Sequence, residues 1–184
     1  MYNYLIRKKI FYFLSKKFHI YDPNGNVVGY CKQKAFRLKE DIRIYTNEEQ
    51  NVELIHIQAR NIIDFCGHYD VYDSQNRQFL GSWRRKGWSS LFRDKWEMLD
   101  CYGNVVGELS EDSMFLAFVR RFLCKLIPQK YYLNNNGVTQ VTYAQHFNPF
   151  VFKLDVKLAD TCQIPPYLVL AGGVLLSAIE GRQE

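Results

Sequence analysis

The sequence predicts a mainly β protein, a closed antiparallel β-barrel of about 12 strands around a central apolar C-terminal α-helix. Three observations lead to this prediction: a β-hairpin pattern that occurs in four places, further alternating segments between these copies, and an uncharged run near the end of the chain. The chain has 184 residues, of which 47% are hydrophobic and 16% aromatic. This length and composition suffice for one core, and we expect residues 1–184 to form a single domain.

The N-terminal segment, residues 1–18, predicts two short strands, because Tyr and Phe alternate with Lys along it. Lys8, Lys9, Lys16 and Lys17 interrupt its apolar residues, so the uninterrupted apolar region of a cleavable signal peptide does not develop. A basic start without acids also fits a transit peptide, but the alternation favours strands.

Four segments share the pattern of a β-hairpin, in which an alternating apolar strand, a turn rich in Asp, Asn and Gly, and a second apolar strand follow one another. A short acceptor side chain opens each turn, and glycine permits a positive φ. The recurring carboxylates are therefore explained by turn formation without catalysis. The segments are residues 18–31, 69–83, 96–109 and, more loosely, 130–143; the turns open with Asp22, Asp73, Asp100 and Asn134 and contain Gly25, Gly103 and Gly137.

Other alternating segments complete the predicted barrel. Residues 37–45 and 51–64 add strands around the polar turn 46–50, and residues 149–160 alternate apolar with polar side chains. About twelve strands joined by short turns make a sheet too long to stay open, so we expect it to close. The interior of such a barrel is too wide for its own side chains to fill.

The uncharged run Tyr167–Ile179 predicts the helix that fills this interior, with bounds at about residues 165–180. At about 1.5 Å per residue it is roughly 20 Å long, which is short of the roughly 30 Å of hydrocarbon in a bilayer, and we expect no transmembrane span. Gly173, Ser177 and Gly181 leave one side of the helix bare for close approach. Residues 111–127 predict a second, amphipathic helix.

Basic residues are clustered in the sequence, although the net charge is only +5. Lys and Arg concentrate in residues 1–17, 84–95 and 120–130, and all three tryptophans lie in or beside the middle cluster. Tryptophan beside Arg and Lys is typical of a membrane interface, where each base gains about 1 kcal/mol near an anionic surface. The predicted lipid-headgroup residues are Arg84, Arg85, Lys86, Arg120, Arg121, Lys16 and Lys17, with Trp88 as interfacial anchor. In the alternative interpretation, Trp83 and Trp96 point into the core and the bases form a solvated edge.

Other classes of function have weaker support. Aromatic residues between bases can stack on single-stranded nucleic acid, but no recognition motif occurs and the pI of about 8.9 is only mildly basic. The four histidines are scattered without metal-ligand spacing, and no nucleophile or phosphate-loop motif is present. We therefore expect no enzymatic activity, no catalytic or metal site and no cofactor. Five widely spaced cysteines without a CxxC pair predict reduced thiols in a cytosolic protein.

The hairpins IYDPNGNVVG at 20–29 and LDCYGNVVG at 99–107, followed by a lone apolar helix, resemble the LURP-one-related family. This family is grouped with tubby C-terminal domains and phospholipid scramblases, and the resemblance implies a twelve-stranded antiparallel barrel threaded by a C-terminal helix. On the scramblase side, Trp88, Leu91, Arg93 and Asp94 resemble one short pattern, and Leu154–Lys157 resembles the LDVK before the terminal helix. The resemblance covers nearly the whole chain.

Several features of these relatives are missing. Scramblases have a proposed calcium-binding acidic segment directly before LDVK, whereas residues 142–152 contain no carboxylate. The proline-rich N-terminal extension and the palmitoylated cysteine cluster are also missing, and no residue matches the phosphoinositide-binding bases of tubby domains individually.

These observations lead to a hypothesis of function: a non-enzymatic cytoplasmic module that attaches peripherally to anionic, phosphoinositide-like membrane lipid. Two alternatives stay open. One is a protein-interaction scaffold without lipid affinity, and the other is a phospholipid scramblase whose terminal helix enters the bilayer.

Overall fold

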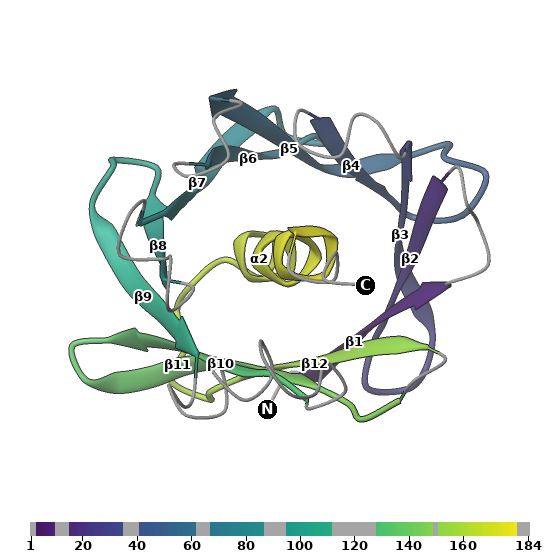
Figure 1. Cartoon of the computed structure of the whole chain (residues 1–184). Helices are drawn as coiled ribbons and strands as arrows, with labels where there is room; N and C mark the ends of the chain where they lie inside the picture. The colour runs from purple at the N-terminus through teal and green to yellow at the C-terminus, as the bar shows by residue number, and fades with distance from the viewer. Residues whose placement is uncertain are drawn as a thin grey trace.

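The structure, a computed structural model, describes residues 3–9, 15–34, 41–61, 67–86, 95–111, 128–148 and 151–179. Twelve β-strands form one closed barrel, and α2 lies inside it (Figure 1). The predicted closed antiparallel barrel around a C-terminal helix is therefore confirmed. The elements are β1 (Asn3–Lys9), β2 (Ser15–Tyr21), β3 (Val27–Lys34), β4 (Asp41–Tyr45), β5 (Glu53–Asn61), β6 (His68–Asp73), β7 (Gln78–Arg85), β8 (Lys95–Asp100), β9 (Val105–Glu111), β10 (Lys130–Asn135), β11 (Val138–Gln145), β12 (Phe152–Leu158) and α2 (Pro166–Ile179).

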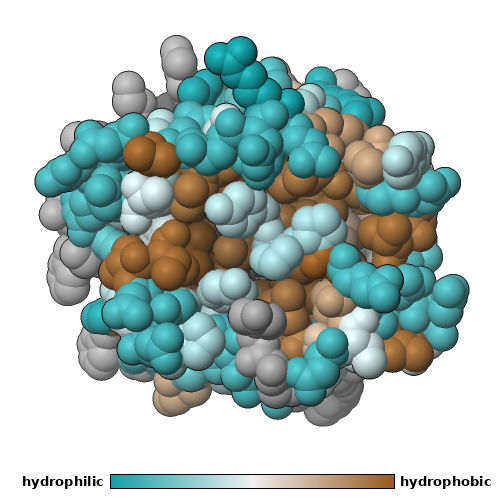
Figure 2. Space-filling view, turned by 180° about the vertical axis from the view of Figure 1, so that it is seen from behind, coloured by the Kyte–Doolittle hydropathy of each residue, from teal (hydrophilic) through white to brown (hydrophobic). Residues whose placement is uncertain are grey.

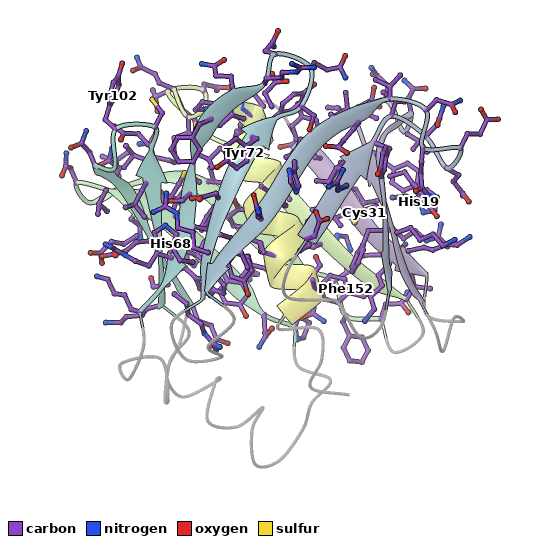
Figure 3. The ribbon with its side chains drawn as sticks, turned by 90° about the horizontal axis from the view of Figure 1, so that it is seen from above. His19, Cys31, His68, Tyr72, Tyr102 and Phe152 are labelled. Carbon is purple, nitrogen blue, oxygen red and sulfur yellow. The ribbon has the colours of Figure 1, made fainter. Side chains whose placement is uncertain are left out.

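Every strand pairs antiparallel with the next one along the chain, and β1 pairs with β12 to close the barrel. The two ends of the barrel are consequently different. At one end, which we call the turn end, short connections join β2 to β3, β4 to β5, β6 to β7, β8 to β9 and β10 to β11. The opposite end, called the far end, is where β1, β3, β5, β7, β9 and β11 finish. In Figure 3 the turn end, with Tyr102, is at the top, and Phe152 marks the far end.

The predicted Asp-led turns are present at the turn end. The carboxylate of Asp22 accepts hydrogen bonds from the backbone N–H groups of Asn24 and Asn26 at 2.9 and 2.8 Å, and Gly25 has a φ of 82°. Asp73 and Asp100 each accept two equivalent backbone bonds in their own turns. The looser fourth copy differs, because Asn134 accepts a hydrogen bond from the Thr139 hydroxyl instead. Short acceptor side chains thus set the geometry of three hairpins.

The central helix is enclosed by the strands. Every residue of α2 from Leu168 to Ala178 is buried. The Trp83 Nε1–H on β7 donates a hydrogen bond of 2.9 Å to the carbonyl of Leu168, and the Tyr143 hydroxyl on β11 donates one of 2.9 Å to the carbonyl of Val169. These bonds attach the first turn of the helix to two separate parts of the barrel wall. Within the described residues, no helix combines the length and hydropathy that crossing a membrane requires.

The second predicted helix, residues 111–127, lies outside the described residues except for Glu111. Glu111 was expected to begin that helix, but it is the last residue of β9 and is buried with 4% of its surface exposed. Its cross-strand neighbour is Tyr131 on β10. Pairing with β10 therefore extends the strand by two residues beyond the predicted hairpin copy, which ends at residue 109.

Cys31, on the inner face of β3, provides a test of core burial by pH. Burial raises the pKa of its thiol from 9.0 to about 12. As the pH rises through about 9, the unfolded chain loses this proton while the folded chain keeps it. The contribution of the protonated thiol to the free energy of unfolding is therefore complete below about pH 9 and is lost progressively towards about pH 12. We expect Cys31→Ala to lower the free energy of unfolding by about 1 kcal/mol at neutral pH and to reduce its decline between neutral and alkaline pH. Urea denaturation at several pH values measures both effects, and an unchanged slope in the variant would contradict the assignment.

Candidate functional site

The described members of the predicted lipid-headgroup set lie at the far end of the barrel. Arg84 and Arg85 end β7 and Lys86 follows them, while Lys16 and Lys17 are near the start of β2. Four strands, β3 to β6, separate the two groups on the shorter way round the barrel, so they lie on different sides of the far end. Arg120, Arg121 and Trp88 lie outside the described residues.

Arg84 and Lys86 are engaged by acidic residues on neighbouring strands. The Arg84 Nε and Nη2 atoms donate to Glu97 Oε2 at 2.9 and 2.6 Å, and Lys86 Nζ lies 2.9 Å from Glu97 Oε1 and 3.0 Å from Glu108 Oε1. Burial raises the pKa of the Glu97 carboxyl, but hydrogen bonds from Lys86 and Arg84 outweigh it, and the net pKa is below the ordinary value. Two bases and two acids therefore balance one another in charge at this position.

Arg85 has a different environment, because alternate residues of a strand face opposite sides of the sheet. Its guanidinium lies 5.9 Å from the centroid of the Trp96 ring, a cation–π arrangement. Trp96 and Trp83 are 2% and 1% exposed and belong to the hydrophobic core. Of the two interpretations for these tryptophans, the core position is therefore the one observed.

Lys17 lies on the outer face of β2, beneath the turn between β4 and β5. Its Nζ is 3.7 Å from Glu48 Oε2, and the His19 ring nitrogen Nε2 is 2.7 Å from Glu48 Oε1. His19 is only 5% exposed. Lys16 precedes Lys17 in the same strand. The charge of Lys17 is therefore also partly balanced by an acid.

Three far-end bases that the sequence interpretation had not singled out are exposed. Arg7, Lys32 and Lys130 lie toward the far ends of β1, β3 and β10. Within the described part of the chain, no acid forms an ion pair with any of them. Lys32 stands apart from the three basic clusters of the sequence, whereas Arg7 and Lys130 belong to the clusters at 1–17 and 120–130. Only the order of the strands around the barrel places all three at one end.

The charges separate along the barrel axis. Toward the far end, the described strand residues and Lys86 include many more bases than acids, the acids being Asp41, Asp70, Glu97, Glu111 and, in the middle of β9 beside Lys86, Glu108. The far-end bases are Arg7, Lys8, Lys9, Lys16, Lys17, Lys32, Lys34, Arg60, Arg84, Arg85, Lys86, Lys95, Lys130 and Lys153. At the turn end the balance is reversed, with Arg77, Lys157 and, in the middle of β4 beside Glu53, Arg43 as the described bases. The turn-end acids are Asp22, Glu48, Glu49, Glu53, Asp73, Asp100 and Asp160.

This arrangement is suited to electrostatic binding. A one-sided excess of positive charge attracts an anionic surface and orients the molecule toward it. Within the described ranges, no group of three or more His, Cys, Asp or Glu side chains is placed to hold a metal ion. The far end thus carries both the described predicted bases and the three newly recognised ones, Arg7, Lys32 and Lys130.

Comparison with known proteins agrees with the fold. A model of the LURP-one-related family matches residues 2–164, which include all twelve strands and end just before α2. Neither the curated proteins nor the solved structures contain a match to this chain.

Proposed function

The chain belongs to the LURP-one-related family, and from this premise we propose that it is a non-enzymatic cytoplasmic module that docks on anionic membrane lipid with the far end of its barrel. The observation that carries the proposal is the separation of charge between the two ends. An anionic bilayer attracts the basic far end and repels the acidic turn end, which gives the bound molecule one orientation. Phosphoinositide-like headgroups, with several phosphate charges, fit such a surface best.

The individual bases contribute differently to this docking. Arg7, Lys32 and Lys130 are exposed and have no ion-pair partner among the described residues, so their charge acts in full on a nearby membrane. Arg84 and Lys86 must first exchange Glu97 and Glu108 for phosphate. Because Glu97 is only 8% exposed, leaving its carboxylate without these partners has a cost, and Arg84 and Lys86 therefore contribute less to docking than the exposed bases do. Trp88, Arg120 and Arg121 are included in the proposal because they lie in the basic clusters of the sequence.

We expect the double variant Lys32→Glu/Lys130→Glu to bind anionic vesicles at least roughly thirtyfold more weakly than the wild type, because each base contributes about 1 kcal/mol near the membrane and reversal of its charge adds repulsion to that loss. The measurement is co-sedimentation with phosphatidylcholine vesicles that contain phosphatidylserine or a phosphoinositide, across a salt series. The matched control is Lys157→Glu, an exposed base at the turn end. It should bind as the wild type does.

The control distinguishes binding through the far end from binding that depends on the net charge of the protein alone. Equal weakening in the control would show that total charge, not the far end, determines binding. If the wild type fails to bind anionic vesicles even at low salt, the lipid proposal is rejected and the protein-interaction alternative takes its place.

The bases beside Glu97 need a separate variant. Removing only Arg84 and Lys86 would take both of these partners from the mostly buried carboxylate of Glu97. The triple variant Arg84→Gln/Lys86→Gln/Glu97→Gln therefore replaces Glu97 as well, so that no unpaired charge is left buried at this position. We expect a smaller loss of vesicle binding, about threefold, because these bases are already partly balanced. Unchanged binding would remove Arg84 and Lys86 from the proposed site.

A further inference from the structure

Apolar side chains are exposed at the turn end of the barrel. Val105 and Val138 are 46% and 55% exposed, and Tyr102, within the turn between β8 and β9, is 86% exposed. Val27, Val28 and Val52 are the other exposed large apolar residues of the described turn end. All lie in the short connections or in the first residues of the strands that follow them. Val27, Val28 and Val105 belong to the repeated NVV of the hairpin pattern, yet the fold leaves them exposed.

Figure 2 shows the turn end, where apolar side chains gather across the middle and hydrophilic side chains surround them. Near the turn end of the barrel, the partly buried Leu54, Leu80, Val106, Ile164 and Tyr167 pack against the core. The apolar interior therefore continues to the surface at this end. Contiguous exposed apolar area of this kind, with a polar rim, is characteristic of protein-interaction sites.

Three carboxylates of the surrounding turns carry charge that no described base balances. Asp22, Asp73 and Asp100 accept hydrogen bonds from backbone N–H groups and from neutral Asn side chains, and none of the three forms an ion pair within the described residues. The side-chain bonds from Asn26 and Asn104 are the largest influences that lower the pKa of Asp22 and Asp100. For Asp73, burial raises the pKa, but the hydrogen bonds from Asn76 and Gln75 outweigh burial, so the net pKa lies below the ordinary value. All three carboxylates are therefore ionised at neutral pH.

We propose that the turn end is a docking face for a basic amphipathic segment of a partner protein. Apolar side chains of the segment would cover the valines, and its Lys and Arg side chains would pair with the carboxylates of Asp22 and Asp100, while Asp73, which is 9% exposed, adds negative charge beside them. Charge complementarity selects this occupant. An anionic membrane is repelled by the acidic rim, and a second copy of the chain would bring like charges together. The inference does not depend on lipid binding at the far end, but both together would make the barrel an adaptor between a membrane and a basic partner.

The direct test uses a fluorescein-labelled synthetic peptide with Lys and Leu at helical spacing, measured by fluorescence anisotropy across a salt series. Two control peptides replace Lys by Glu or Leu by Ser. We expect binding of the Lys/Leu peptide alone, weakening as salt rises. Equal binding of the Lys/Ser peptide would overturn the proposal, because the apolar face would then have no part in it. Absence of binding by the Lys/Leu peptide at low salt would overturn it as well.

Variants locate the peptide on the protein. Asp22→Asn/Asp73→Asn/Asp100→Asn removes three charges while each Asn keeps an acceptor oxygen for its turn, and Val105→Thr/Val138→Thr keeps the β-branched shape while adding a hydroxyl. Each variant should weaken peptide binding roughly tenfold, with the circular dichroism of the wild type. Lys32→Glu/Lys130→Glu, at the far end, should bind the peptide at least as well as the wild type does.

Other occupants give different results in the same experiments. Unchanged peptide affinity in both turn-end variants would overturn the proposal, and so would a peptide-induced change in amide NMR shifts confined to the far end. A wild-type dimer in sedimentation velocity that Val105→Thr/Val138→Thr dissociates would assign the face to a second copy. Loss of vesicle binding in that valine variant would assign it to lipid. If the triple Asp variant does not fold, the single Asp100→Asn variant and the peptide controls still decide the question.

Discussion

Val174→Asp is expected to lower the free energy of unfolding by about 4 kcal/mol or more, because a carboxyl group would lie inside the barrel without a partner. Val174 is in the middle of α2 and is 0% exposed. The residues that surround α2 in the core are apolar or are engaged with the helix backbone, so the described interior provides no base for the new group. A domain at the low end of ordinary stability, about 5 kcal/mol, would keep only about 1 kcal/mol after this loss.

Urea denaturation and thermal melting measure this effect. The matched control is Val138→Asp, the same chemical change at a position that is 55% exposed, for which we expect a change below about 1 kcal/mol. If Val174→Asp were as stable as the control, α2 could not be packed inside the barrel in solution. That result would favour the scramblase alternative, in which the terminal helix leaves the barrel for the bilayer.

Gly172→Ala is expected to lower the free energy of unfolding by about 2 kcal/mol, although alanine is the better helix former by about 1 kcal/mol. A methyl group at position 172 would overlap the Trp83 ring. Trp83 has little freedom to move away, because it is 1% exposed and its Nε1–H is bonded to the Leu168 carbonyl. Relief of the overlap requires either the loss of this bond or a displacement of α2 from the wall.

The neighbouring glycine provides the control for this prediction. A methyl group at Gly173 would lie 2.6 Å from Ile6 Cδ1, the end of a flexible side chain that can turn aside. We expect Gly173→Ala to change the free energy of unfolding by less than about 1 kcal/mol, with the gain in helix propensity offsetting the repacking. Chemical denaturation of the two variants side by side is the measurement. Equal stability of the two would show that Trp83 does not limit how closely α2 approaches the barrel.

Most of the architecture was predictable because its causes act over short distances. The Asp-led turns depend on hydrogen bonds that reach two to four residues along the chain, as from Asn24 and Asn26 to Asp22. The alternation of strands and the length of the run Tyr167–Ile179 are equally local. Glu111 shows the limit of such arguments: it resembles the acidic start of a helix, but pairing with Tyr131 places it in a strand.

The candidate site was only partly predictable. Basic clusters in the sequence drew attention to Arg84 and Lys86, but the register of β7 with β8 places Arg84 opposite Glu97, and the ion pairs follow from that register. Lys32 was missed because it is separated from the basic clusters along the chain, and Lys130, at the end of the cluster 120–130, was not selected from it. They become neighbours of the far-end surface through the order of the strands around the barrel.

By itself, the sequence determined the β class, the hairpins, the family and the buried helix, since periodicity and turn chemistry are written in neighbouring residues. The tertiary structure decided how charge and apolar area are distributed. Closure of the barrel by β1 and β12 collects bases at one end and acids with exposed valines at the other. Such a distribution depends on contacts between residues far apart in the chain, and no local pattern specifies it.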